Sequence, residues 1–150
     1  GMSMFQVSYI NKTIIDEIIY ILENNNIVAV NEESCTIKGF QTDNIINLFK
    51  TDLLKKILPL EDFYKKIFHL HYIYYYLNGY QMEHNHIKTE KYSFILYLNN
   101  ADGNTIFKEP ISESISPELG KLIFFSSDIM HRSEISTNGK KVLVGAVDKV

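Results

Sequence analysis

The sequence predicts a single α+β domain in which amino-terminal helices pack against an antiparallel sandwich or barrel of short strands. Two observations predict this fold class. Apolar residues recur with the helical period of 3.6 over roughly the first 60 positions, and from about Phe68 the period changes to two. The chain has 150 residues, enough to bury one core and few for two, so we treat 1–150 as one domain.

The first helix is expected between Thr13, as its cap, and the run Asn24-Asn25-Asn26 that ends it. Within these limits isoleucine and leucine recur at i, i+4 from Ile14 to Leu22. Residues 27–30 are β-branched or small and form a short strand candidate.

A second amphipathic helix is expected from about Asp43 to Leu58, because its apolar residues again follow the helical spacing. Pro59 should stop it, since proline removes a backbone donor and clashes with the preceding turn. Residues 61–67 could add a further turn or two.

After Phe68 the sequence consists of short β-branched and aromatic runs separated by glycine, asparagine, aspartate and proline. The expected strands lie in 69–77, 92–100, 104–110, 120–127 and 140–147. Helices followed by many short strands favour a jelly roll, that is, a cupin-like double-stranded β-helix with the helices packed on it.

Composition excludes several classes of function. The net charge of -3 and the pI near 5.9 do not provide the excess of positive charge that is typical of proteins that bind nucleic acid or an anionic membrane. No apolar run is long enough to span a bilayer, and no signal peptide is evident. The single cysteine, Cys35, predicts a reducing, cytoplasmic setting. Gly1 before Met2 has the form of a scar from tag removal.

Three histidines form the most informative pattern. His84 and His86 stand at i, i+2, so in an extended strand both side chains face one pocket. A third histidine on a later strand, His131, can close a facial set of ligands and leave open metal positions for substrate and oxygen. A second pair, His69 and His71, lacks a later partner and is interpreted as strand residues, one face buried and one exposed.

Four motifs follow one another in the carboxy-terminal half: a glycine loop before a histidine pair, a strand ending in Tyr-Leu-Asn, a glycine-led strand before histidine and arginine, and a last strand with a cation. In order they are YLNGYQMEHNH (76–86), ILYLNNADGNTIF (95–107), SPELGKLIFFSSDIMHR (116–132) and STNGKKVLVGAV (136–147). Their order and spacing resemble the iron(II)- and 2-oxoglutarate-dependent dioxygenases, in particular the prolyl-hydroxylase-like and phage-type branches. The likeness covers about half of the chain.

The resemblance implies Fe(II) and 2-oxoglutarate as cofactors, with His84, His86 and His131 as metal ligands. It also implies that Lys141 binds the far carboxylate of 2-oxoglutarate beside the hydroxyl of Tyr97. This sequence departs from the family pattern at His86, where relatives have aspartate, and at Lys141, where many have arginine. The alternative interpretations are that Lys141 is an ordinary surface lysine and that Tyr97 is an ordinary residue of the core.

Two other functions stay open. His84, His86, Glu90 and His131 nearly fit the two-part motif of metal-binding cupins, which would make Glu90 a fourth ligand. A jelly-roll binding module that has lost its metal is the non-enzyme alternative, supported by the missing aspartate. On the oxygenase interpretation the substrate is unidentified, and a peptide or a small molecule is favoured.

Overall fold

The computed structural model describes residues 4–27, 35–58 and 66–150. Within these residues there are two α-helices, α1 (Lys12–Glu23) and α2 (Thr51–Ile57), and a short 3-10 helix, η1 (Ile46–Leu48). The strands are β1 (Phe5–Tyr9), β2 (Thr36–Gln41), β3 (Ile67–His84), β4 (Glu90–Tyr97), β5 (Thr105–Phe107), β6 (Glu113–Ile115), β7 (Lys121–Ser126), β8 (His131–Ser136) and β9 (Lys140–Lys149).

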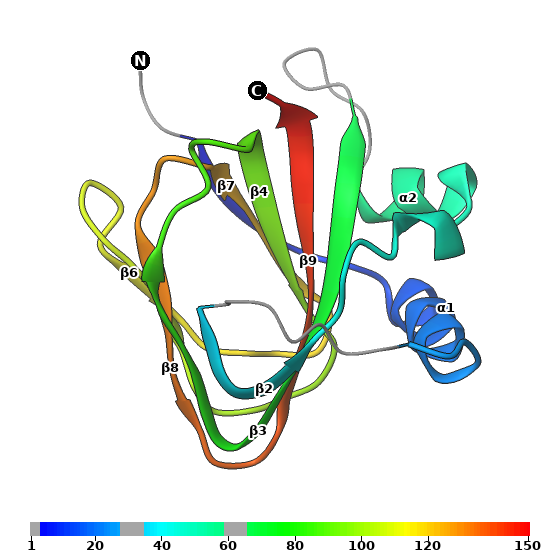
Figure 1. Cartoon of the computed structure of the whole chain (residues 1–150), viewed down its shortest axis with the longest axis horizontal. Helices are drawn as coiled ribbons and strands as arrows, with labels where there is room; N and C mark the ends of the chain where they lie inside the picture. Colours follow the sequence, from blue (N-terminus) through cyan, green and yellow to red (C-terminus); the bar gives the residue numbers. More distant parts are fainter. Residues whose placement is uncertain (1–3, 28–34, 59–65) are drawn as a thin grey trace.

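The strands form one curled, antiparallel sheet with the order β1-β7-β4-β9-β3-β8-β5-β6, and β2 pairs with β3. The sheet folds over on itself, and the two helices cover its outer face on one side (Figure 1). The predicted α+β jelly roll with packed helices is therefore confirmed.

Strand β3 connects the two walls of the curl. Its first part pairs with β9 and its end pairs with β8, which sets His84 opposite His131. The strand bends where Asn78 has a φ of 69° and Gly79 follows. A Cβ on Gly79 would lie 2.5 Å from the carbonyl oxygen of Lys38, so only glycine fits this crossing.

Because side chains alternate along each strand, the sheet carries a core on both faces. The inner core, inside the curl, comprises Ile73, Tyr75, Ile95, Tyr97, Phe107, Ile123, Phe125, Ile129 and Val142. The outer core, between sheet and helices, includes Ile15, Ile18, Leu53, Ile57, Leu70, Phe94, Leu96, Leu122, Phe124, Leu143 and Val147. A strand such as β9 is therefore apolar on both sides.

The first helix forms where expected, with a different cap. The side-chain oxygen of Asn11 accepts a hydrogen bond from the backbone N–H of Thr13 at 2.8 Å, so Asn11, not Thr13, caps α1. The helix ends at Asn24, as predicted. Ile15 and Ile18 are fully buried against the sheet, each contributing about 1.5–3 kcal/mol of hydrophobic stabilisation.

The prediction of one helix over 43–58 is wrong, because η1 and α2 are separated by extended backbone at Phe49 and Lys50. The side-chain oxygen of Asn44 accepts hydrogen bonds from the backbone N–H groups of Ile46 and Leu70, which ties this segment to β3 instead of continuing a helix. Most of the strand candidate at 27–30 and of the helical extension at 61–67 lies outside the described residues; Ile67 itself begins β3.

Candidate metal centre

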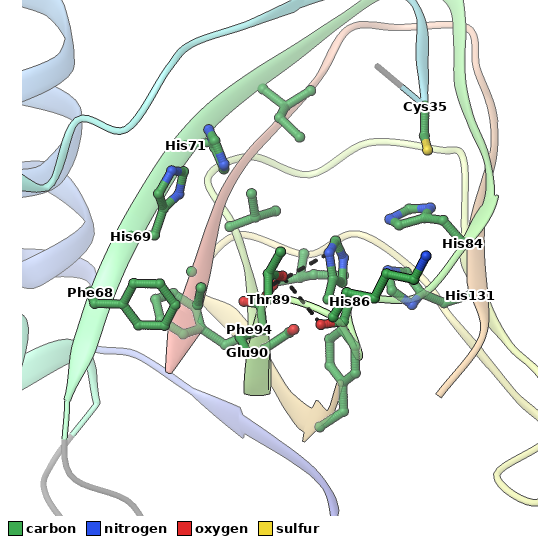
Figure 2. Close-up of a pocket in the computed structure, with 18 of the residues that line it drawn as sticks. Cys35, Phe68, His69, His71, His84, His86, Thr89, Glu90, Phe94 and His131 are labelled. Carbon is green, nitrogen blue, oxygen red and sulfur yellow. Dashed lines mark hydrogen bonds and ion pairs between the residues drawn. The ribbon is translucent and has the colours of Figure 1, made fainter. Parts of the chain in front are cut away.

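The structure brings His84, His86 and His131 together at one end of the curl. One ligand atom from each lies within 4.8 Å of the others. The ring centroids of His84 and His131 are 4.3 Å apart, and His86 is 4.8 Å and 5.3 Å from them (Figure 2). With metal–nitrogen bonds of about 2.0–2.1 Å the rings would draw closer on binding.

These histidines come from different elements, which the fold holds in register. His84 ends β3 and His131 begins β8, and the two are cross-strand partners. His86 lies two residues beyond β3, where its backbone N–H donates to the carbonyl of Ser127 at 2.9 Å. The site is thus built on paired backbone rather than on a free loop.

Hydrogen bonds fix which ring nitrogen is available. Nδ1 of His84 lies 2.7 Å from the carbonyl oxygen of Met82, and Nδ1 of His131 lies 3.0 Å from that of Ile129. A carbonyl only accepts, so in both rings Nδ1 carries the proton and Nε2 keeps its lone pair. This is the tautomer and ring orientation that a metal ligand requires.

Burial keeps the three imidazoles neutral. His131 is 2% exposed, and burial, reinforced by His84, lowers its pKa to about 3. Burial with neighbouring histidines likewise lowers the pKa of His86 to about 4, and burial lowers that of His84. At neutral pH the cluster therefore presents lone pairs instead of positive charges, which favours a divalent cation.

Glu90, the fourth ligand of the cupin alternative, is not part of this cluster. It is 6% exposed, and its Oε1 lies 3.5 Å from Nδ1 of His86 and accepts a hydrogen bond from the hydroxyl of Thr89 at 3.0 Å. Burial, only partly offset by hydroxyl hydrogen bonds, raises its pKa to about 7. The carboxylate faces Nδ1 of His86. In His84 and His131 the same ring nitrogen contacts a backbone carbonyl.

The two adjacent lysines of β9 occupy opposite faces, and Lys141, expected to bind the far carboxylate, does not face the interior of the curl. Lys141 lies beside Tyr74 on the outer face, its ammonium 5.4 Å from the ring centroid. Lys140 points into the curl, where its ammonium donates to the carbonyl of Gly103 at 2.7 Å and lies 4.5 Å over the ring of Tyr75. The buried cation of this strand is therefore Lys140.

The physical reason is the alternation along β9. Lys140 shares its face with Val142 of the inner core, whereas Lys141 shares its face with Leu143 of the outer core. Lys140 is 0% exposed, and burial lowers its pKa to about 8 despite the opposing effects of Asp102 and Glu134.

Tyr97 lies in the inner core with Tyr75 and is fully buried. Its hydroxyl is hydrogen-bonded to the hydroxyl of Thr105, and burial raises its pKa. Tyr97 and Lys140 thus line the same interior, deep to the histidines, but neither borders the cavity that the histidines line.

That cavity has a volume of about 590 Å³ and is lined by all five histidines of the chain. His69 and His71 form a wall on β3, across the cavity from His84 and His131 (Figure 2). Their ring centroids are 4.0 Å apart, and Nδ1 of His71 lies 2.9 Å from the carbonyl of Thr42.

The expectation of a strand with one buried and one exposed face does not hold for this part of β3. His69 and His71, at i, i+2, share the face that lines the cavity, and Leu70 between them is buried in the outer core on the other face. The face of His69 and His71 is also that of Ile73 and Tyr75 in the inner core. Every second residue of a strand lies on the same face. If the inward face of β3 had been known, the sequence would have placed His69 and His71 on it.

Comparison with known proteins gives a likeness in structure alone. The sequence matches no protein-family model and no curated protein. Among solved structures, a prolyl-4-hydroxylase from Pseudomonas putida superposes with a TM-score of 0.72 at 12% identity, covering 99% of this chain and 92% of that one.

Two further structures support the same assignment of fold. A Trichoplax adhaerens prolyl hydroxylase in complex with a peptide fragment of the hypoxia inducible factor oxygen degradation domain has a TM-score of 0.70 at 12% identity, covering 96% and 83%. HygX from Streptomyces hygroscopicus, with nickel and 2-oxoglutarate bound, has a TM-score of 0.71 at 7% identity, covering 96% and 82%. The chain therefore has the fold of these oxygenases over nearly its whole length.

Proposed function

We propose that this protein is an iron(II)- and 2-oxoglutarate-dependent oxygenase that hydroxylates a peptide or a small molecule. The observation that supports this most is the cluster of His84, His86 and His131, set on the fold of oxygenases of this kind. Two of the imidazoles have Nδ1 engaged by a backbone carbonyl and so keep Nε2 for a metal.

The donor set fits iron(II). Imidazole suits iron, zinc, copper and nickel, and three ligands on one side leave positions for a chelating cosubstrate and for oxygen. Together, bound iron and 2-oxoglutarate would supply oxygen activation, placing one atom of O₂ in a substrate C–H bond and the other in succinate as CO₂ leaves. Three neutral ligands leave the centre one charge more positive than two histidines and an aspartate do.

Lys140 is the residue we propose for the far carboxylate of 2-oxoglutarate, in place of Lys141. Its ammonium is buried, and its hydrogen-bond acceptor is the neutral Gly103 carbonyl. A carboxylate at this position would give a buried cation the opposite charge that burial makes favourable. Tyr97 would present its hydroxyl from the same interior.

The remaining walls would keep water from the reacting groups. Phe107 and Phe125 pack on the ring of His131 with centroid separations of 5.6 and 5.0 Å. They cover part of the ring of His131, and substrate would enter from the cavity that His69 and His71 border. A volume of about 590 Å³ suits a small molecule or one side chain of a peptide.

The lone cysteine, Cys35, is unpaired and supports a cytoplasmic setting as part of this proposal. Among the described residues, no helix has both the length and the apolar character needed to cross a bilayer. With a net charge of -3, nucleic acid is not an expected partner.

The test is a spectrum. Anaerobic protein given Fe(II) and then 2-oxoglutarate should develop the weak visible charge-transfer band of a keto acid chelated to ferrous iron, which needs two adjacent open metal positions. Iron binding without the band would favour the cupin alternative, and absence of iron binding would favour the non-catalytic module.

The same band separates the two lysines. Lys140→Ala should raise the 2-oxoglutarate concentration needed for half of the band by at least tenfold, because the far carboxylate loses its ion pair. Lys141→Ala, the matched control on the outer face, should leave that concentration unchanged. The reverse ranking would restore Lys141 to the role.

A further inference from the structure

We infer that Glu90 is a positioning residue that holds His86 as a ligand and supplies, from behind that ring, the negative charge that an aspartate ligand would supply directly. This inference rests on the metal centre proposed above. It gives a role to a buried carboxylate that the proposed reaction does not otherwise use.

A short turn brings the two residues together. The backbone N–H groups of Thr89 and Glu90 both donate to the carbonyl of His86, at 3.1 and 3.2 Å. One helical turn of this kind sets side chains at i and i+4 on the same side, so Glu90 reaches the ring of His86. Oε1 of Glu90 lies 3.5 Å from Nδ1 of His86 (Figure 2).

Both ends of the turn are fastened to Ser127. The backbone N–H of His86 donates to the carbonyl of Ser127 at 2.9 Å, and the hydroxyl of Ser127 donates to the carbonyl of Glu90 at 2.5 Å. Thr89 adds a hydroxyl hydrogen bond to the carboxylate. The backbone of the turn is therefore held in place, and the hydroxyl of Thr89 helps to hold the carboxylate beside the ring.

The charge balance of the site also points to a metal. Glu90 is 6% exposed, and among the described residues the basic group beside its carboxylate is the imidazole of His86 at 3.5 Å, not a lysine or arginine. A buried carboxylate is costly unless a positive charge compensates it. A divalent cation on Nε2 of His86 would provide that charge through the ring, while Nδ1–H donates to the carboxylate.

This arrangement differs from direct ligation. The cluster of possible ligand atoms contains the three histidines and excludes Glu90. A carboxylate behind a metal-bound imidazole orients the ring and makes it a stronger ligand, and loss of such a partner typically costs 10–100-fold in metal affinity. The missing aspartate would thus be replaced by a pair, His86 and Glu90.

The experiment uses Co(II) alone as probe, without 2-oxoglutarate or oxygen, on Glu90→Gln. Glutamine keeps the shape and removes the charge, so the Kd for Co(II) should rise about 10–100-fold while the shape of the visible Co(II) band stays the same. Glu83→Gln is the matched control: it removes a carboxylate next to His84 that pairs with Lys108 at 3.2 Å, and should change the Kd less than threefold.

Two further measurements guard against a merely structural effect. The Fe(III)/Fe(II) potential should become more positive in Glu90→Gln, because a negative charge near the metal is lost. Glu90→Asp, which keeps the charge, should bind Co(II) more tightly than Glu90→Gln. The inference is overturned if Glu90→Gln binds Co(II) like wild type, if Asp is no better than Gln, or if the band changes intensity as expected for a lost direct ligand.

The two proposals fail in different ways. Wild type that binds Co(II) but never forms the 2-oxoglutarate band overturns the oxygenase and leaves the role of Glu90 standing. An affinity indifferent to Glu90→Gln in a protein that does form the band overturns Glu90 alone. Wild type that binds no Co(II) overturns both.

Discussion

At the scale of single residues, chemistry here depends on which nitrogen or which face a side chain presents. His84 and His131 present Nε2 because a carbonyl two residues earlier holds Nδ1 in each case. Lys140 presents a buried cation because it lies on the inner face of β9, whereas its neighbour Lys141 does not. A shift of one position along the strand changes the face on which the side chain lies.

Substitution of a metal ligand and substitution of a residue that only lines the cavity should have different effects on metal affinity. We expect His131→Ala to abolish Co(II) and Fe(II) binding, because only two of the three candidate ligands of the cluster would remain. His71→Ala, in the same cavity on the opposite wall, should leave the Kd for Co(II) within about threefold of wild type. Equal losses in the two variants, measured by Co(II) titration, would contradict the assignment of ligands.

The buried ammonium of Lys140 should make stability depend on pH. Its pKa is about 8 in the folded protein and 10.5 when unfolded, so below pH 8 the folded state bears the full cost of a buried charge, about 3 kcal/mol. Between about pH 8 and 10.5 the unfolded state binds more protons, and stability contributed by this residue rises with pH.

The measurement compares wild type with Lys140→Met by chemical denaturation at several pH values. The free energy of unfolding of wild type minus that of the variant should rise by up to about 3 kcal/mol between pH 8 and 10.5. A difference that stays constant over this range would show that the ammonium is not held in the way described.

At the scale of elements, the site depends on how two segments change direction. Strand β3 bends at Asn78 and Gly79 and so delivers His84 to β8. The turn from His86 to Glu90 then returns the chain to β4. The bend lies within β3 and the turn joins β3 to β4, and together they place His84 and His86.

Substitutions at the two residues of the bend should have opposite effects on stability. Gly79→Ala should destabilise the protein by about 1–3 kcal/mol, since the new Cβ would meet the Lys38 carbonyl at 2.5 Å, and should weaken Co(II) binding by moving His84. Asn78→Gly should be neutral or stabilising by up to about 1 kcal/mol, because glycine adopts a positive φ without strain. Thermal unfolding and Co(II) titration measure both. If Gly79→Ala is as stable as wild type, the close crossing is not a constraint.

At the scale of the whole molecule, one sheet separates two cores with different tasks. The inner core supports the histidines, Lys140 and Tyr97, and the outer core joins the helices to the sheet. The candidate metal centre, at the end of β3 and the start of β8, is therefore supported by the sheet, and the helices lie beyond β3 on the other side of the curl from β8 (Figure 1).

This division predicts that outer-core damage lowers stability without changing the site. Ile18→Ala, at a fully buried position of α1, should cost about 2–5 kcal/mol of unfolding free energy, from lost burial and the cavity left behind. The folded fraction should still bind Co(II) with the Kd of wild type. A large change in Kd, measured well below the unfolding transition, would show that the helices take part in shaping the site.

The sequence by itself determined the change from helical to strand periodicity, the jelly roll and the choice of three candidate ligands, because these depend on local spacing and residue chemistry. It did not predict β1, β2 or β6, which are short or at sheet edges and are formed by pairing with distant strands. It also joined η1 and α2 into one helix, since the bonds from Asn44 to β3 are not visible in the spacing.

Only the tertiary structure shows that Lys140 and not Lys141 points into the curl, and that His69 and His71 line the cavity. Both questions ask which face of a strand points inward, and β9 and β3 are apolar on both faces because each core lies on one of them. Apolar and polar residues therefore do not alternate along these strands, and the sequence alone does not show which face points inward. The role of Glu90 has the same origin: its spacing from His86 is local, but only the folded turn shows that the carboxylate lies behind the ring and not among the ligands.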